Sequence, residues 1–256
     1  MSANEAVFGV DVGGSGVKGA PVDPATGRLL ADRERFETPQ PATPEAVAQV
    51  ISDLLLEFSW KGPVGVTVPA VVQDGVVRTA ANIDKSWIGC RFVDELAEHH
   101  GIEATVLNDA DAAGLAEMRH GAGRECDGVV FLATLGTGIG SALFVNRTLV
   151  PNTEFGHFEL HGDAAEKYAA ASIRKSEGLS WTKWGKRVDE YLHVVELLVR
   201  PELIVLGGGV SRRAEKWIDE ITVEAKVVPA ELQNNAGIVG AAMSAAEVRA
   251  GTARQP

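Results

Sequence analysis

Carboxylates stand where an apolar, strand-like run passes into an alanine-rich, helix-like run, in the segment Leu107-Asn108-Asp109-Ala110-Asp111. An aspartate fixed at such a boundary can accept the proton of a hydroxyl whose oxygen attacks phosphorus. General-base help of this kind is typically worth about 10²–10⁴ in rate. We therefore take Asp109 as the candidate base and Asn108 as a ligand for two neighbouring hydroxyls. The alternative is that Asp109 or Asp111 only caps the helix, which suits Asp111 better.

A glycine-rich turn joins two apolar runs near the N-terminus and reads Asp11-Val12-Gly13-Gly14-Ser15-Gly16-Val17-Lys18. Glycines at a hairpin tip let the backbone approach a ligand and point N–H groups at phosphate oxygens. Asp11 can hold Mg²⁺ through water, and Lys18 can neutralise phosphate charge. The spacing is not that of a P-loop, in which the glycines and lysine open a helix. A plain glycine turn with a surface lysine explains these residues equally well.

Two more glycine turns occur later in the chain, Gly136-Thr137-Gly138 and Gly207-Gly208-Gly209. The Thr137 hydroxyl beside backbone donors suits phosphate, and a nucleoside or phosphate can lie against the bare backbone of the third turn. Each turn alone is equally compatible with an ordinary tight turn. The first two hairpins correspond, Gly13 with Gly136 and the closing valines with each other, which indicates an internal duplication.

Polar side chains suited to binding a polyol lie just after the second hairpin, in Pro151–His157. Glu154 and His157 can each bind vicinal hydroxyls, although a structural histidine is the alternative. Asn82, in a polar loop, is a further candidate for the same pocket, although a surface loop with Trp87 packed down explains this stretch equally well.

A basic, tryptophan-rich stretch covers residues 181–187 and contains Lys183, Lys186 and Arg187. In an acidic chain it can form a phosphate-binding face. The alternative is a tryptophan pair packed in the core, on a helix whose outer face is solvated.

An alternation of strand-like and helix-like runs must position these residues. Apolar and helical spacing predicts where the strands and helices lie. The expected strands are a hairpin at 7–22, a third strand at 28–38, strands at 64–68 and 104–107, a second hairpin at 129–145, and a strand at 203–206; the expected helices are 46–58, 92–100, 109–120 and 237–249.

Composition narrows the class of protein. The chain has 256 residues and a net charge of −11. That charge argues against nucleic acid or an acidic membrane as a partner. No apolar run approaches the roughly 20 residues of a membrane span, and the N-terminus does not read as a signal peptide. Cys90 and Cys126 form no disulfide framework or C-x-x-C pair, which favours a cytoplasmic protein.

Five motifs occur in the order found in the ROK group of bacterial sugar kinases, and the chain resembles that family along nearly its whole length. They are DVGGSGVK, LNDADAAG, TLGTGIG, TEFGH and LGGGVS. Further stretches are similar to the polyphosphate-using branch of the family: AANIDKSW, NDADAAGLAE, PNTEFGH and GLSWTKWGKRVDEYL. The resemblance implies an α/β, two-lobed actin/hexokinase-like (ribonuclease H-like) duplicated fold with a central cleft.

The resemblance also implies roles for individual residues. Asp109 is expected to be the base, and Asp11 the Mg²⁺ residue. The sugar ligands are expected to be Asn82, Asn108, Asp109, Glu154, His157 and Glu166. The donor and its phosphates are expected to meet Asp11, Gly13, Gly14, Ser15, Gly16, Lys18, Gly136, Thr137, Gly138, Gly207, Gly208, Gly209, Lys183, Lys186 and Arg187. Residues 158–167 hold no cysteine, so structural zinc is not expected.

The expected lobes are residues 1–108 and 109–256, with the last helix packing back on the first. The expected reaction moves a phosphoryl group from inorganic polyphosphate, with ATP as a further donor, to the 6-hydroxyl of glucose in a homodimeric protein. A strictly ATP-dependent hexokinase and a sugar sensor that lacks catalysis remain alternatives. Both phosphate hairpins together with Asp109 argue against the sensor.

Overall fold

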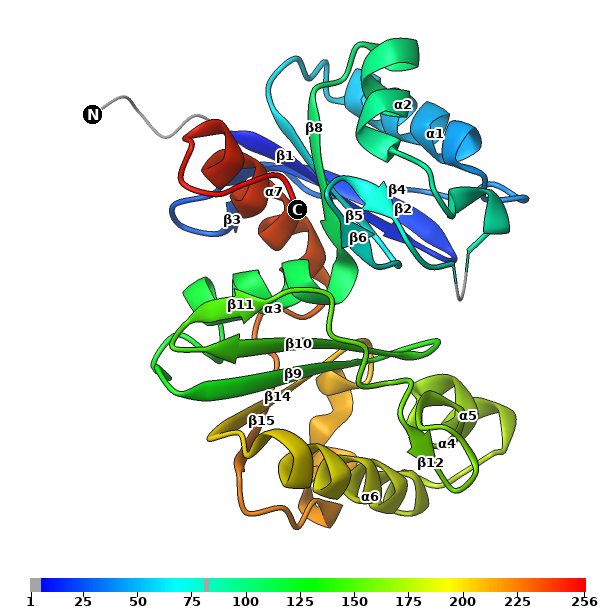
Figure 1. Ribbon diagram of the computed structural model, residues 1–256, viewed down its shortest axis with the longest axis vertical. Coiled ribbons are helices and arrows are strands. Elements are labelled where there is room, and N and C mark those ends of the chain that lie inside the picture. Colours follow the sequence, from blue (N-terminus) through cyan, green and yellow to red (C-terminus); the bar gives the residue numbers. More distant parts are fainter. Residues whose placement is uncertain (1–5, 81–82) are drawn as a thin grey trace. The chain divides into compact units, whose positions relative to one another are not determined.

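The computed structural model describes residues 6–80 and 83–256. The chain forms two compact units. The first contains the chain up to Ala116 together with Asn235–Pro256, and the second is Glu117–Asn234. Each unit is built on its own sheet (Figure 1).

The sheet of the first unit has the order β3-β2-β1-β5-β8, with β4 also paired to β2. Strands β1, β5 and β8 run parallel, whereas β2 pairs with β1 antiparallel. The strands are β1 (Val7–Gly13), β2 (Gly16–Asp23), β3 (Arg28–Leu29), β4 (Glu34–Phe36), β5 (Val64–Val68) and β8 (Ala104–Asn108).

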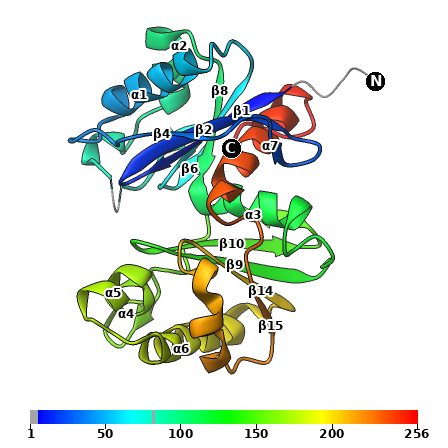
Figure 2. The ribbon, with the colours of Figure 1, turned by 180° about the vertical axis from the view of Figure 1, so that it is seen from behind.

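Helices cover both faces of this sheet (Figures 1 and 2). On one side lie α1 (Pro44–Glu57) and α2 (Phe92–His100), which bury apolar side chains against alternate strand residues such as Phe8 and Val66. On the other lies α7 (Ala236–Arg249), whose backbone packs directly on glycines of the strands. The C-terminal helix therefore belongs to the first unit although it is last in the chain.

The sheet of the second unit has the order β11-β10-β9-β14-β15, in which β9, β14 and β15 are parallel. Its strands are β9 (Val129–Leu135), β10 (Ile139–Val145), β11 (Thr148–Val150), β14 (Leu203–Gly207) and β15 (Lys226–Pro229). Helix α6 (Trp181–Val199) starts at Ser180, whose side chain accepts a hydrogen bond from the Lys183 N–H. Its buried face packs Trp184 and Tyr191 onto β9 and β14. The helical segments before it are α4 (Glu166–Ala169) and α5 (Ala171–Ser176).

Helix α3 (Asp109–His120) connects the units, because its residues up to Ala116 belong to the first and the rest to the second. The small remaining elements are β6 (Val72–Gln73), β7 (Val76–Val77), β12 (Glu159–Leu160), β13 (Asp163–Ala164), and the 3-10 turns η1 (Lys85–Trp87), η2 (Ser211–Lys216), η3 (Ile218–Glu220) and η4 (Gln233–Asn235).

Most of the predicted elements are confirmed, including both glycine hairpins. They differ by one residue at the tip, because Gly13 pairs with Gly16 in the first whereas Leu135 pairs with Ile139 in the second. The third strand predicted at 28–38 is wrong as a continuous element. Residues 28–29 and 34–36 pair separately with β2, and the chain leaves the sheet between them, where Leu30 is exposed.

Candidate active site

The carboxyl ends of three parallel strands meet at one edge of the first sheet, because Asp11 is in register with Thr67 and Val68 with Asn108. The Thr67 hydroxyl donates to Asp11 Oδ1 at 3.1 Å, and Lys18 Nζ lies 3.5 Å from Oδ2. The predicted metal residue and the predicted phosphate-binding lysine are therefore neighbours, and the buried threonine fixes the rotamer of the carboxylate.

The tip of the first hairpin consists of two exposed residues, Gly14 and Ser15. The Thr38 hydroxyl donates to the carbonyl of Gly13 at 2.5 Å, and the guanidinium of Arg35 donates to the carbonyl of Ser15. With these carbonyls engaged by side chains, the tip can present backbone N–H groups and positive charge to an anion. Arg35 was not among the predicted residues.

Asn108 caps helix α3. Its Oδ1 accepts from the N–H groups of Ala110 at 2.9 Å and Asp111 at 3.0 Å, and its Nδ2 donates to the carbonyl of Ala70 at 3.1 Å. An asparagine side chain accepting from the first N–H groups is the usual solution at a helix N-terminus. The capping role weighed for Asp109 or Asp111 thus falls to Asn108, which retains one Nδ2 hydrogen for a hydroxyl.

Asp109 is the first residue of α3 and is half-buried. Its Oδ1 accepts from the N–H of Ala110 at 2.8 Å. A carboxylate in the first turn of a helix is favoured by the helix dipole, which stabilises its ionised form. The strand, the Asn108 cap and this hydrogen bond hold one carboxylate at the edge where β8 ends, as a base requires.

In the second unit, an imidazole lies between two carboxylates. His157 Nδ1 is 3.4 Å from Glu154 Oε2, and His157 Nε2 is 3.7 Å from Glu166 Oε1. Burial raises the pKa of the Glu154 carboxyl, His157 opposes that rise, and the like charge of Glu166 adds to it. Glu154 and His157, predicted from one stretch, and Glu166, expected from the resemblance, thus gather in one cluster.

Glu166 also joins this cluster to the second hairpin, since its Oε2 accepts from the N–H of Ile139 at 3.2 Å. At the hairpin tip, the backbone N–H of Ser172 donates to the Gly136 carbonyl at 3.0 Å, and the Ser172 hydroxyl donates to the Thr137 carbonyl at 2.6 Å. The carbonyl of Gly138 accepts from the Gly136 N–H at 2.9 Å. The carbonyls of the tip are therefore satisfied from within the second unit.

The third glycine turn lies beside the second hairpin, because β14 is parallel to β9 and Gly207 is in register with Thr134. Gly208 has φ +84°, and a Cβ there would lie 2.3 Å from the carbonyl oxygen of Leu135. Only glycine fits such a backbone-to-backbone approach. The chain then enters the short 3-10 turn η2.

The basic stretch of α6 divides into two kinds of residue. Lys183 and Lys186 are exposed. Arg187 instead donates to the Tyr168 carbonyl at 3.3 Å and to Glu177 Oε2 at 2.7 Å. Trp184 is fully buried, as the alternative of a packed tryptophan pair required. The outer lysines remain available to an anion, whereas Arg187 has structural partners.

Three residues that sequence reasoning missed support the site: Thr67, Arg35 and Ser172. A polar residue inside the apolar run Val64–Val68 was a usable signal for Thr67. Nothing local marked Arg35 or Ser172, whose roles depend on hairpin tips distant in the sequence. Asn82 lies outside the described residues.

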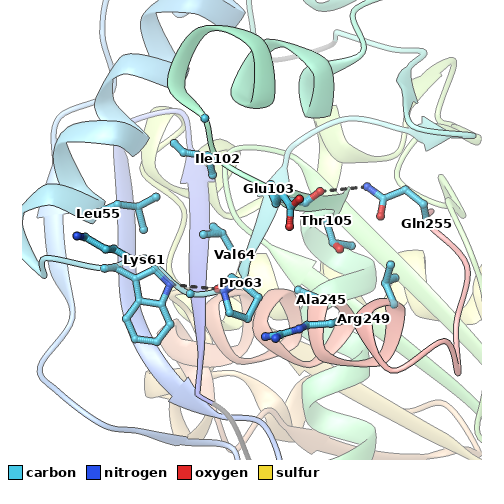
Figure 3. Close-up of a pocket in the computed structure, with 15 residues that line it drawn as sticks. Leu55, Lys61, Pro63, Val64, Ile102, Glu103, Thr105, Ala245, Arg249 and Gln255 are labelled. Atoms are coloured by element: carbon cyan, nitrogen blue, oxygen red, sulfur yellow. Dashed lines mark hydrogen bonds between the residues drawn. The ribbon is translucent and has the colours of Figure 1, made fainter.

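A cavity of about 640 Å³ opens at the other edge of the first sheet, where β5 and β8 begin (Figure 3). Lys61, Glu103 and Arg249 bring both signs of charge to it, and Gln255 adds a neutral amide. It shares no lining residue with the sites above.

Among the described residues, no group of three or more His, Cys, Asp or Glu side chains is placed to hold a metal ion. No helix in the described part of the chain is long and apolar enough to span a membrane.

The paired α/β units with their glycine hairpins define a two-lobed actin/hexokinase-like protein. Within that class, the chain belongs to the ROK family, whose model matches residues 7–170. It is 55% identical over 238 residues to a polyphosphate glucokinase of Mycobacterium tuberculosis, covering 93% of this chain and 90% of the relative.

Two solved structures are also similar to this chain. The inorganic polyphosphate/ATP-glucomannokinase of Arthrobacter sp. strain KM superposes with a TM-score of 0.92 at 46% identity, over 95% of this chain and 99% of that one. A ROK family glucokinase from Streptomyces griseus, solved with glucose and AMPPNP, has a TM-score of 0.82 at 26% identity, over 94% of this chain and 99% of that one.

Proposed function

We propose that this protein is a glucokinase that transfers a phosphoryl group from inorganic polyphosphate, and from ATP as a second donor, to the 6-hydroxyl of glucose. The observation that carries the proposal is the 55% identity, over 93% of the chain, to a relative named polyphosphate glucokinase. Asp109, held at the start of the helix that Asn108 caps, and the two glycine hairpins support it independently.

Asp109 is the base of the proposed reaction. Its carboxylate takes the proton of the glucose 6-hydroxyl as that oxygen forms a bond to the terminal phosphorus of the donor. The bond from this phosphorus to its bridging oxygen breaks, and the shortened polyphosphate or ADP leaves with the electron pair. The remaining hydroxyls of the sugar bind Asn82, Asn108, Glu154, His157 and Glu166.

The donor phosphates bind N–H groups at both hairpin tips, in Gly13–Gly16 and at Thr137 and Gly138, with Lys18 neutralising charge. The Gly136 N–H already donates to the Gly138 carbonyl, so Gly136 contributes the shape of the turn. Asp11 suits Mg²⁺, since this ion keeps most of its waters and needs only one or two carboxylates. When bound, the ion would neutralise charge that develops on the phosphoryl oxygens. Gly207–Gly209 would face the nucleoside of ATP.

Lys183 and Lys186, both exposed on α6, are the proposed contacts of a long polyphosphate chain. Arg187 is a weaker candidate than its two neighbours because its guanidinium already has protein partners. In this proposal the two lysines favour polyphosphate, whereas the rest of the donor site can bind the phosphates of any phosphoryl donor.

The proposed enzyme also has an expected location, metabolic role and oligomeric state. A cytoplasmic location is supported by the free cysteines Cys90 and Cys126, and a role at the entry of glucose into glycolysis is consistent with the product. A homodimer is proposed from the family resemblance, and sedimentation of the purified protein tests it.

The deciding experiment is glucose phosphorylation by the purified protein with Mg²⁺, with polyphosphate and ATP supplied in parallel. Turnover with polyphosphate at least equal to that with ATP is the expected result. Turnover with ATP alone would make the protein an ordinary ROK hexokinase. Glucose binding without turnover on either donor would make it a sugar sensor.

A further inference from the structure

The chain passes between the two units twice, once inside α3 at Ala116–Glu117 and once at Asn234–Asn235. The side chain of Glu117, which is 1% exposed, reaches from the first passage to Glu231 and Leu232, just before the second. A carboxylate is rarely buried unless it is fully hydrogen-bonded. The proposed reaction makes no use of it, so another role must explain its burial.

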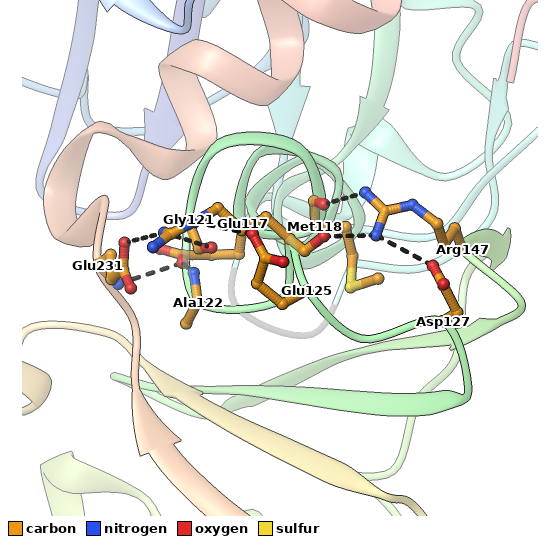
Figure 4. A network of polar contacts seen from close by, with 9 residues as sticks. Glu117, Met118, Gly121, Ala122, Glu125, Asp127, Arg147 and Glu231 are labelled. Atoms are coloured by element: carbon orange, nitrogen blue, oxygen red, sulfur yellow. Dashed lines mark hydrogen bonds and ion pairs between the residues drawn. The ribbon is translucent and has the colours of Figure 1, made fainter.

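Three backbone N–H groups donate to the Glu117 carboxylate. Figure 4 shows Glu117 within its polar network, with Ala122 and Glu231 beside it. Oε2 accepts from Ala122 at 2.8 Å and from Glu231 at 3.1 Å, and Oε1 accepts from Leu232 at 2.7 Å. Hydrogen bonds to an ionised acceptor are roughly twice as strong as neutral ones. One side chain therefore fastens the end of α3 to the segment that leads back to the first unit.

The turn after α3 contains a glycine, Gly121, that leaves room for the Glu117 carboxylate. A Cβ at Gly121 would lie 2.0 Å from Glu117 Oε2, so a glycine is needed for the turn after α3 to reach the carboxylate. Arg124 adds a second tie, donating to the Gly121 carbonyl at 3.1 Å and to Glu231 Oε2 at 2.6 Å. The guanidinium of Arg147 donates to the carbonyls of Met118 at 2.8 Å and of Arg124 at 2.7 Å.

On the first unit's side of the second passage, Arg33 Nη1 donates to Asn235 Oδ1 at 2.9 Å. Leu232 is fastened in the second unit and Asn235 in the first, with residues 233–234 between the two anchors. The side chain of Gln233 also contacts the second unit, because Arg212 Nε donates to its Oε1 at 3.2 Å. Gln233 has a left-handed φ of +50°, a conformation that few residues other than glycine and asparagine adopt readily. The segment between the anchors is therefore short and conformationally distinct.

We propose that Glu117 is a positioning residue, a clamp that makes the two connections between the units act as a single joint. With both passages fastened to the second unit, rotation of the units is confined to the residues just outside the clamp, at 115–116 and 233–234. The catalytic part of the proposal rests on the proposed function, in which Asp109 of the first unit acts on a sugar bound by Glu154 of the second.

The test compares Glu117→Gln with Glu125→Gln. Glutamine replaces one acceptor oxygen by an NH₂ group, which cannot accept from a backbone N–H. Glu125 is the matched control, because it receives the same change within the same network yet its side chain is 90% exposed and lies 3.7 Å from Arg124 Nε. Spin labels at Glu98→Cys in the first unit and Glu215→Cys in the second, with Cys90 and Cys126 replaced by alanine, report the distance between the units.

The expected result is a broader distance distribution for Glu117→Gln than for the parent and for Glu125→Gln, measured without any substrate. Turnover of the same variant should fall about tenfold or more while its dissociation constant for glucose changes less, since loss of alignment costs rate more than affinity. A clamp that only stabilises the fold would lower the melting temperature without broadening the distribution.

Equal distributions for folded Glu117→Gln and Glu125→Gln overturn the proposal. Because the distances are measured in the free protein, this outcome is independent of whether the protein proves to be a glucokinase. If Glu117→Gln does not fold, replacement of Leu232 by its α-hydroxy analogue removes one of the three N–H donors and keeps every side chain. The same broadening is expected, and an unchanged distribution refutes the clamp.

Discussion

Asp109 is the residue whose replacement should separate binding from chemistry. Asparagine keeps an Oδ1 that can accept from the Ala110 N–H, so the start of α3 is preserved. It cannot take a proton, and we expect kcat to fall by about 10²–10⁴ while glucose binding stays nearly normal. Kinetics and calorimetric titration with glucose check this, and turnover within a few-fold of the parent would remove Asp109 from the role of base.

Single residues were predicted from the sequence where a chemically suitable side chain stands at a visible boundary between two secondary-structure elements. Asp109 and the glycine hairpins stand at boundaries visible as changes of hydrophobic pattern. The capping role of Asn108 was not predicted, because several polar residues near the start of α3 can each cap a helix and only the backbone conformation selects one. Glu117 was not predicted because two of its three partners lie 114 and 115 residues away in sequence.

At the scale of elements, the packing of α7 on the first sheet depends on a strand glycine. A Cβ at Gly65 would lie 1.9 Å from the carbonyl oxygen of Ala241, which is backbone and cannot rotate away. Gly65→Ala should therefore push the helix off the sheet, costing about 1–3 kcal/mol or more. A fall of several degrees in melting temperature is expected, at about 2–4 °C per kcal/mol for a protein of this size.

The control for that change is Gly14→Ala at the tip of the first hairpin, where a new Cβ would meet no heavy atom within 4 Å. Its melting temperature should match that of the parent. If Gly65→Ala melts at the same temperature as Gly14→Ala, close contact between α7 and β5 is not a source of stability.

Helices and strands were predicted well where the hydrophobic residues follow one clear period, and poorly where strand pairing determines the structure. The helix after Thr43 and the hairpins were predictable from caps, glycines and apolar runs. The break within residues 28–38 was not, because its two halves pair with different parts of the same strand, a tertiary choice that alternation does not encode. The return of α7 to the first unit was expected from the family resemblance, not from its pattern.

At the scale of the whole molecule, a net charge of −11 must be reconciled with a polyanionic donor. The global field repels polyphosphate, so a local cluster of cations has to offset that repulsion. Exposed Lys183 and Lys186, one turn apart on α6, can do so. A short donor such as ATP should depend on them much less.

The double variant Lys183→Gln/Lys186→Gln should raise KM for long-chain polyphosphate several-fold and leave KM for ATP and for glucose nearly unchanged. The control Lys61→Gln/Lys226→Gln makes the same change in net charge at exposed lysines on β15 and just before β5. The comparison of the two double variants separates local attraction from net charge. Steady-state kinetics at two ionic strengths check that the effect is electrostatic, because added salt should shrink the difference in polyphosphate KM between the parent and the α6 double variant. Equal changes in KM for the two double variants would mean that net charge alone governs polyphosphate binding, and α6 would lose its assigned role.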